Sequence, residues 1–152
     1  WIYKPGLPSN CPKIVSDKFD KVEANFTNKI YVENPESTKD WTTHEWLHFI
    51  GRIDSSWSLA DFKQGDKLFE FTSSSNSEIA AAWFEKSIRA GYKTAYPAIE
   101  KFLIKVGRRK FLTPLYTAFK ESGELATAKA IYVKARPNYH FVSTNTMDKL
   151  LK

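Results

Sequence analysis

Apolar residues recur every three or four positions along most of the chain, which is the period of an amphipathic helix. In residues 16–32 the members of the first such stripe are Phe19, Val22, Phe26 and Ile30. This spacing predicts one helix of about four turns, with Ser16 as its N-cap. Residues 34–40, which are polar and contain a proline, interrupt the pattern and predict a loop.

Six later segments continue the helical period. They are residues 43–50, 56–71, 77–91, 94–107, 110–123 and 124–136. Pro97 falls where only the first turn of a helix tolerates proline. No alternating pattern bounded by turns indicates a strand; residues 29–33, KIYVE, are the nearest candidate and fit better as the end of a helix. The tail after Arg136 shows no obvious pattern.

These segments predict an all-α chain of about seven or eight helices, each of roughly 8–17 residues, joined by short loops. The simplest packing is a series of antiparallel helix pairs stacked in two layers. Such a stack forms a short superhelix, as armadillo and HEAT repeats do. No residue pattern repeats strictly, so the repeat is expected to be structural only.

Composition and charge narrow the possible functions. With 152 residues, of which 42% are hydrophobic, the chain can form one domain with its own core. The net charge of +6 is spread diffusely, which is typical of a solvated surface, so we expect no nucleic-acid binding. No apolar run approaches the roughly 20 residues of a membrane span, and we expect no membrane association. A single cysteine, Cys11, cannot form an internal disulfide; this suits a reducing compartment, and we expect a cytoplasmic location.

Residues 44–48, HEWLH, match the pattern H-E-x-x-H, in which two histidines bind zinc and the glutamate activates a water. Three observations argue against such a site at His44, Glu45 and His48. Zinc peptidases with this motif usually have a third ligand, a glutamate roughly nineteen residues beyond the second histidine. In this sequence that position is Lys67. Both histidines fall about 160° from the centre of the apolar face, so we expect them to face water. The predicted helix is also short. We therefore predict no catalytic residue and no metal ligand in this chain.

The chain opens with WIYKPGLPSNCPK and has no initiator methionine and no hydrophobic signal segment. The prolines and glycine predict an extended connector over residues 1–13. Residues 14–152 are then a single α-helical domain. We expect the chain to be a fragment whose connector joins it to a missing upstream domain.

Residues 76–119 carry a more specific pattern. Its features are N-S-E-I at 76–79, Trp83, A-x-P at 95–97 and G-R-x-K-F-x-x-P-L at 107–115. Together with the opening WIYKPGLP, they resemble the C-terminal helical domain of leukotriene A(4) hydrolase and related zinc aminopeptidases. The resemblance implies a right-handed superhelix of helix pairs. It also implies a parent protein with an N-terminal β domain and a zinc catalytic domain, whose own H-E-x-x-H motif lies upstream of this chain.

Residues 107–111, GRRKF, form a second candidate site. We expect Arg108 and Lys110 to lie in the turn after a helix that ends at Gly107. An arginine fork there could bind a carboxylate through two hydrogen bonds, and a lysine would add a point charge. Alternatively, the basic residues are solvated or interact with the C-terminal dipole of the preceding helix. The resemblance implies that Arg108 is the main clamp on the substrate carboxylate and that Lys110 is a second cation; Arg109 is given no role.

The resemblance as a whole implies the C-terminal domain of a zinc aminopeptidase that hydrolyses short peptides with a free carboxylate. This domain would wall the substrate cleft, while the upstream catalytic domain of the same chain would hold the zinc. The fragment alone is then expected to bind no cofactor and to be inactive. Two alternatives stay open. One is a helical-repeat module that binds a protein or peptide without catalysis. The other is a free-standing metallohydrolase that uses His44 and His48, which would contain stoichiometric zinc.

Overall fold

The computed structural model describes residues 17–152, and every regular element in that part is a helix. The α-helices are α1 (Lys18–Thr27), α2 (Ile30–Glu33), α3 (Thr43–Arg52), α4 (Leu59–Phe69), α5 (Ser77–Ala90), α6 (Tyr96–Lys105), α7 (Arg109–Glu121), α8 (Leu125–Ala135) and α9 (Phe141–Leu150). Short 3-10 segments cover Pro35–Thr38, Phe71–Ser73, Lys93–Ala95 and Arg136–Asn138. The all-α prediction is confirmed. The predicted connector with Cys11, and the predicted N-cap Ser16, lie outside the described residues.

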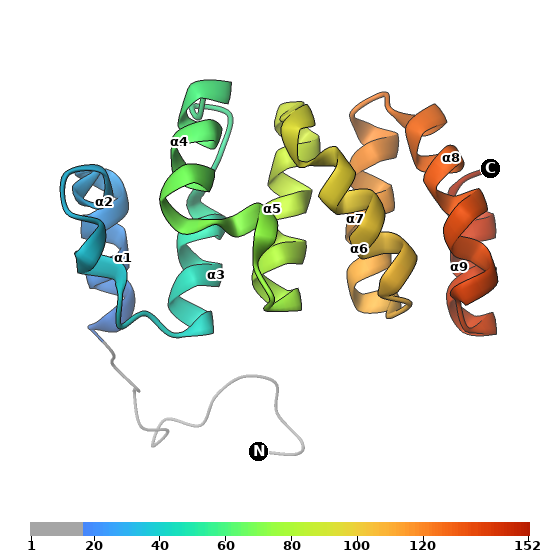
Figure 1. The fold of residues 1–152 in the computed structure, drawn as a ribbon, viewed down its shortest axis with the longest axis horizontal. Helices are drawn as coiled ribbons and strands as arrows, with labels where there is room; N and C mark the ends of the chain where they lie inside the picture. Colours follow the sequence, from blue (N-terminus) through green and yellow to red (C-terminus); the bar gives the residue numbers. More distant parts are fainter. Residues whose placement is uncertain (1–16) are drawn as a thin grey trace, which may run out of the picture.

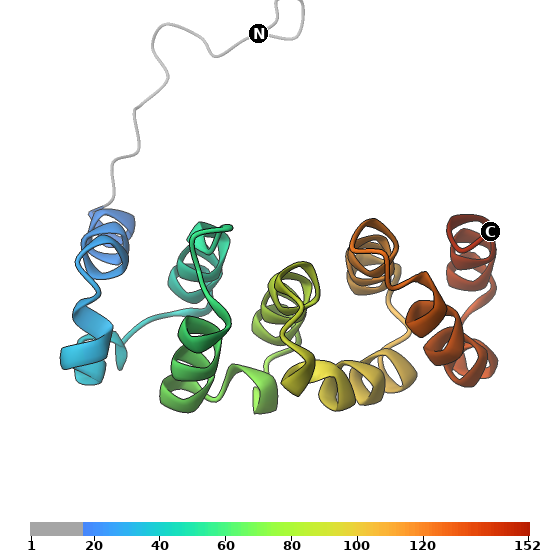
Figure 2. The ribbon, with the colours of Figure 1, turned by 90° about the horizontal axis from the view of Figure 1, so that it is seen from above.

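Successive helices alternate between two layers (Figures 1 and 2). Helices α1, α3, α5, α7 and α9 form the odd-numbered layer, in which each helix packs against the next. Helices α2, α4, α6 and α8 form the other layer, where α6 packs against α8. The predicted two-layer stack of helix pairs is therefore present. Figure 2 shows that the odd-numbered layer is concave on its outer side, with α5 near its deepest point.

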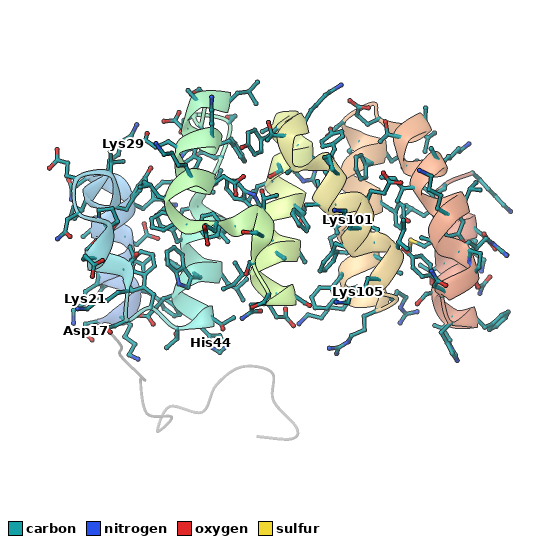
Figure 3. All side chains as sticks on the ribbon, in the orientation of Figure 1. Asp17, Lys21, Lys29, His44, Lys101 and Lys105 are labelled. Carbon is teal, nitrogen blue, oxygen red and sulfur yellow. The ribbon has the colours of Figure 1, made fainter. Side chains whose placement is uncertain are left out.

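The helices of the odd-numbered layer begin at one edge of the stack, which is the lower edge in Figure 1. We call it the N-terminal edge; it contains the first residues of α3, α5, α7 and α9. His44, in the first turn of α3, and Lys105, the last residue of α6, both lie toward this edge in Figure 3. The loop from α6 to α7 therefore lies there as well.

Aromatic side chains fill much of the space between the layers. Trp83 of α5 is fully buried, and its ring packs at 5.1 Å from that of Phe62 and 4.9 Å from that of Phe71. Its indole N–H donates to the Thr72 hydroxyl at 3.0 Å, so the one polar atom of the ring is satisfied. Truncating such a side chain to alanine typically costs about 3–5 kcal/mol. Trp83 thus ties α5 to α4 and to the 3-10 segment that precedes α5.

The first predicted helix is wrong in its second half. The structure divides residues 16–32 at Lys29, whose backbone is left-handed with φ = 52°. Asn25 explains the break, because its side-chain carbonyl accepts the Tyr31 N–H at 3.1 Å and its amide donates to Ser37 at 2.7 Å. With that N–H bonded to a side chain, the chain turns toward the second layer and Tyr31 becomes buried. Ile30, expected on the apolar stripe, is 38% exposed.

The C-terminal tail, for which no pattern was found, forms α9. The helix buries only Ser143 and Met147, four residues apart, while Phe141 is 75% exposed. Such a narrow and partly polar stripe lies below what periodicity alone can detect. Pro97 lies in the first turn of α6, as predicted. No helix within residues 17–152 is long and apolar enough to cross a membrane.

Candidate functional site

Glu45, the glutamate of the HEWLH motif, caps its own helix. One of its carboxylate oxygens accepts the backbone N–H of Thr42 at 2.8 Å and the Thr42 hydroxyl at 2.7 Å. These bonds, the backbone bond foremost, lower the pKa of Glu45 below its ordinary value of 4.5. The side chain is only 8% exposed. A carboxylate held in this capping box points back along the chain and is not available to activate a water on a metal.

The two histidines of the motif have different surroundings. His44 is exposed, as predicted. His48 is not, because its ring stacks on Phe19 of α1 at 4.7 Å and its Nε2 lies 2.7 Å from a carboxylate oxygen of Glu23. The prediction that both histidines face water is therefore wrong for His48, since α1 covers that side of α3. The contacts of His48 with Phe19 and Glu23 join α1 to α3.

The motif residues do not fit a zinc site. Glu45 is engaged with the backbone, and His48 is paired with Glu23. In the part of the chain that the structure describes, no three histidine, cysteine, aspartate or glutamate side chains are grouped closely enough to hold a metal ion. No catalytic step through zinc can be derived from the described residues.

The second candidate site lies at the N-terminal edge, where the structure alters the expected local geometry. Helix α6 ends at Lys105, not at Gly107, and α7 begins at Arg109. Arg108 is the N-cap residue of α7 and has an extended backbone (φ −74°, ψ 117°). Lys110 lies inside the first turn of α7, although the sequence placed it in a turn. Arg108 nevertheless stays in the loop at the edge of the stack, where its side chain is exposed.

This placement puts three cations at the wrong end of a helix. The N-terminus of a helix carries a partial positive charge, and a cation there is unfavourable by about 0.3–1 kcal/mol. Arginine is also a poor N-cap, and Arg108 makes no side-chain capping bond. The basic run starts three residues beyond α6, outside the last turn on which the C-terminal dipole acts. The other alternative, solvated side chains, stays open because all three basic residues are exposed. Lys110 gains an ion pair with Glu78 at this place, but Arg108 gains no ion pair within residues 17–152. A local rule that is broken without such a gain is typical of functional positions.

The two candidate cations meet at one aromatic ring but differ in their partners. The Arg108 guanidinium lies 5.8 Å from the centroid of the Phe111 ring, and the Lys110 ammonium lies 5.5 Å from it. Lys110 also pairs with Glu78 of α5 at 2.6 Å. Among residues 17–152, no carboxylate lies within ion-pair distance of Arg108. Arg108 is therefore the cation of this pair that is free to bind an external anion.

A small hollow of about 150 Å³ adjoins Lys110 on the odd-numbered layer. Its lining comes from α3, α5 and α7 and consists of Leu47, Glu78, Ala81, Ala82, Glu85, Lys110, Phe111 and Pro114. Apolar side chains thus form its floor and walls, and two carboxylates and one ammonium group are its charged groups. The hollow is large enough for part of a small ligand, such as one side chain of a peptide.

A larger pocket of about 640 Å³ lies at the opposite edge, between the end of α3, the start of α4 and the end of α5. Both of its basic residues are already engaged. Lys86 donates to the carbonyls of Gly51 and Ile53, and Arg89 is 2.7 Å from Glu121. This pocket therefore offers no free cation for an anionic ligand, in contrast to the loop at Arg108.

Glu78 is the charged partner of Lys110, and the sequence did not connect the two residues. It is 32 positions from Lys110, and the sequence marked it only as part of a helix start. The signal available was a glutamate in the first turn of one helix and a lysine in the first turn of the next helix in the same layer. Recognising the pair would have required the register between α5 and α7.

Comparisons with known proteins agree with this architecture. The family profile described as "Leukotriene A4 hydrolase, C-terminal" matches residues 41–151. The "Leukotriene A-4 hydrolase homolog" of Botryotinia fuckeliana is 25% identical over an alignment that covers all of this chain and 24% of that protein. "Leucine aminopeptidase 2" of Chaetomium globosum is 24% identical, with 97% of this chain and 25% of that protein covered. The chain thus spans about a quarter of the length of these relatives.

Solved structures show the same fold. Native yeast LTA4 hydrolase superimposes with a TM-score of 0.80 at 20% sequence identity, covering 98% of this chain and 28% of the yeast chain. The complex of the yeast enzyme with bestatin gives a TM-score of 0.76 over 99% of this chain. The profile match covers most of the described helices, from the residue before the α3 N-cap to the end of α9. The chain therefore belongs to the leukotriene A4 hydrolase C-terminal domain family.

Proposed function

We propose that this chain is the C-terminal domain of a zinc aminopeptidase that cleaves short peptides, and that its N-terminal edge forms one wall of the substrate cleft. Hydrolase and aminopeptidase names among the relatives support the reaction class. The observation that carries the proposal is the exposed Arg108 at the start of α7, which is unfavourable for the helix and has no ion-pair partner within residues 17–152.

In this proposal Arg108 binds the free carboxylate of the peptide. Its guanidinium can donate two parallel hydrogen bonds to a carboxylate, which fixes both the distance and the orientation of the peptide end. A peptide held at that end presents its N-terminal bond at a defined place in the cleft, so binding energy far from the scissile bond supports the chemistry. Lys110 is a second cation whose charge is partly neutralised by Glu78.

The zinc and its ligands belong, in this proposal, to an upstream catalytic domain of the same chain. The engaged HEWLH residues support this assignment, since they leave the described helices without a metal site. The 152-residue chain alone then has no peptidase activity. The proposal also places the enzyme in the cytoplasm, because the single cysteine cannot form an internal disulfide.

The test is a substrate comparison in the full-length enzyme. Arg108→Ala should lower kcat/KM for a tripeptide by about 10- to 100-fold, the value of hydrogen bonds to a charged group. The same change should leave kcat/KM nearly unaltered for an amide-blocked aminoacyl substrate, which has no carboxylate to bind. Arg108→Lys should give an intermediate loss, because it keeps the charge but not the fork.

Arg109→Ala is the matched control, since Arg109 is also exposed and directly follows Arg108 as the first residue of α7. We expect it to change kcat/KM for the tripeptide by less than about threefold, as for an exposed charge. Equal losses on the tripeptide and the blocked substrate after Arg108→Ala would remove the carboxylate role. A helical-repeat interaction module would then be the better description of the domain.

A further inference from the structure

The ion pair between Lys110 and Glu78 joins two helices of the odd-numbered layer. The Lys110 ammonium lies 2.6 Å from Glu78 Oε1, and the two side chains are 58% and 35% exposed. The same carboxylate lines the hollow beside α7. Any anion that approaches Lys110 therefore also approaches Glu78.

Glu78 is held in place by its own helix and not only by Lys110. It lies in the first turn of α5, directly after Ser77, and its backbone N–H donates to the side-chain carbonyl of the N-cap Asn76 at 3.0 Å. A carboxylate in the first turn is stabilised by the positive end of the helix. The negative charge is thus a fixed feature of the rim of the hollow.

We propose that Glu78 is a specificity-determining residue that disfavours peptides with an acidic C-terminal residue. The proposal rests on the proposed carboxylate role of Arg108. Arg108, Lys110 and Glu78 together carry one net positive charge, which a single substrate carboxylate neutralises. A second carboxylate, on an aspartate or glutamate side chain, would lie near the carboxylate of Glu78, and the ammonium group of Lys110 beside it is already paired with Glu78.

The composition of the hollow supports the same selection. Its apolar lining from Leu47, Ala81, Phe111 and Pro114 suits an aliphatic side chain. Its second carboxylate, Glu85, pairs at 3.1 Å with Arg89, which is not part of the lining. An acidic side chain in the hollow would face two carboxylates in a partly desolvated place, where like charges repel more strongly than in water.

The test compares two tripeptides that differ only in a C-terminal leucine or glutamate, each with a free carboxylate, on the full-length enzyme. Glu78→Gln should raise the ratio of kcat/KM for the glutamate peptide to that for the leucine peptide by about two- to fivefold, the range of a surface charge interaction. Glu100→Gln is the matched control. Glu100 pairs with Lys134 at 2.6 Å with nearly the same exposure, 34% and 62%, but joins α6 to α8 in the other layer.

An unchanged ratio after Glu78→Gln, or an equal change after Glu100→Gln, would overturn the assignment. The Arg108→Ala comparison separates a failure of the Glu78 specificity role from a failure of the proposed function. If Arg108→Ala selectively impairs free-acid peptides but Glu78→Gln leaves the ratio unchanged, only the specificity role fails. If Arg108→Ala affects free-acid and blocked substrates equally, the proposed function fails first. Thermal unfolding of each variant would establish that the comparison is made on folded protein.

Discussion

Replacing Glu45 by alanine separates a structural role for the HEWLH motif from a catalytic one. The change removes the carboxylate that accepts the Thr42 N–H at 2.8 Å and the Thr42 hydroxyl at 2.7 Å. The N–H then loses its partner at the start of α3, and the helix loses a negative charge next to its positive end. Alanine is a good helix former, so propensity adds no cost.

The expected loss is about 1–2 kcal/mol in the free energy of unfolding, the usual value of a helix cap together with a first-turn carboxylate. For a chain of this length that corresponds to a fall in Tm of about 3–6 °C. Urea unfolding of the 152-residue chain, followed by tryptophan fluorescence, measures the loss directly. Thr42→Ser keeps both the backbone N–H and a hydroxyl, so it should stay close to the parent. His44→Ala, at an exposed position of the same motif, should change stability by less than about 0.5 kcal/mol.

Zinc distinguishes the two roles in the same assay. If HEWLH bound zinc, a concentration of 100 times Kd would stabilise the folded chain by about 2.7 kcal/mol, and His44→Ala would abolish the effect. We expect no zinc-dependent shift in either protein. The capping role of Glu45 would be refuted by a Glu45→Ala variant that unfolds at the same urea concentration as the parent. Stabilisation of the parent by zinc, but not of His44→Ala, would show instead that the motif binds the metal.

Two further predictions concern the C-terminal helices. Tyr139→Phe removes a buried hydroxyl that donates to the Leu103 carbonyl at 2.6 Å, and should cost about 1–3 kcal/mol in urea unfolding. Tyr96→Phe is the control and should be neutral or slightly stabilising, because within the described residues the buried Tyr96 hydroxyl has no hydrogen-bond partner. Equal losses of unfolding free energy in the two variants would contradict a stabilising role for the Tyr139 hydrogen bond. The pKa of Asp148 is lowered from 3.8 to about 2, chiefly by the hydrogen bonds that it accepts from Arg136. Because the folded-state pKa is depressed, this stabilisation is complete above about pH 4 and is lost as the pH falls through about 2. In Asp148→Asn, acid unfolding should lack the loss of stability in that pH range. An acid-unfolding profile identical to that of the parent would count against the ion pair of Asp148 with Arg136.

The helical class and most helix positions could be predicted because they depend on local spacing. Residues 43–50 and 77–91 became α3 and α5 within a few positions, since each carries a broad apolar stripe and a recognisable start or stop residue. The break at Lys29 could not be predicted, because it depends on the Asn25 side chain reaching Tyr31 and Ser37 across a turn. Helix α9 was missed because only Ser143 and Met147 are buried along it, which leaves a narrow apolar face.

The candidate site shows the same limit. The basic run at Arg108 was visible in the sequence, but its relation to α7 was not. Helix α6 ends two residues earlier than predicted and α7 starts one residue earlier, and these small shifts turn a favourable dipole interaction into an unfavourable one. The pairing of Lys110 with Glu78 and the cover of α1 over His48 both depend on the register between neighbouring helices. Such contacts between elements follow from packing and not from spacing along the chain.

A crystal structure of the full-length protein with a non-hydrolysable tripeptide bound would test the carboxylate role of Arg108 most directly. We predict that the peptide carboxylate lies about 2.7–2.9 Å from the Arg108 guanidinium, in a bidentate arrangement at the start of α7. We also predict that the metal ion lies outside the helices described here, with Glu45 still bonded to Thr42. A carboxylate bound elsewhere with Arg108 in solvent, or a metal ion held by His44 and His48, would contradict these predictions.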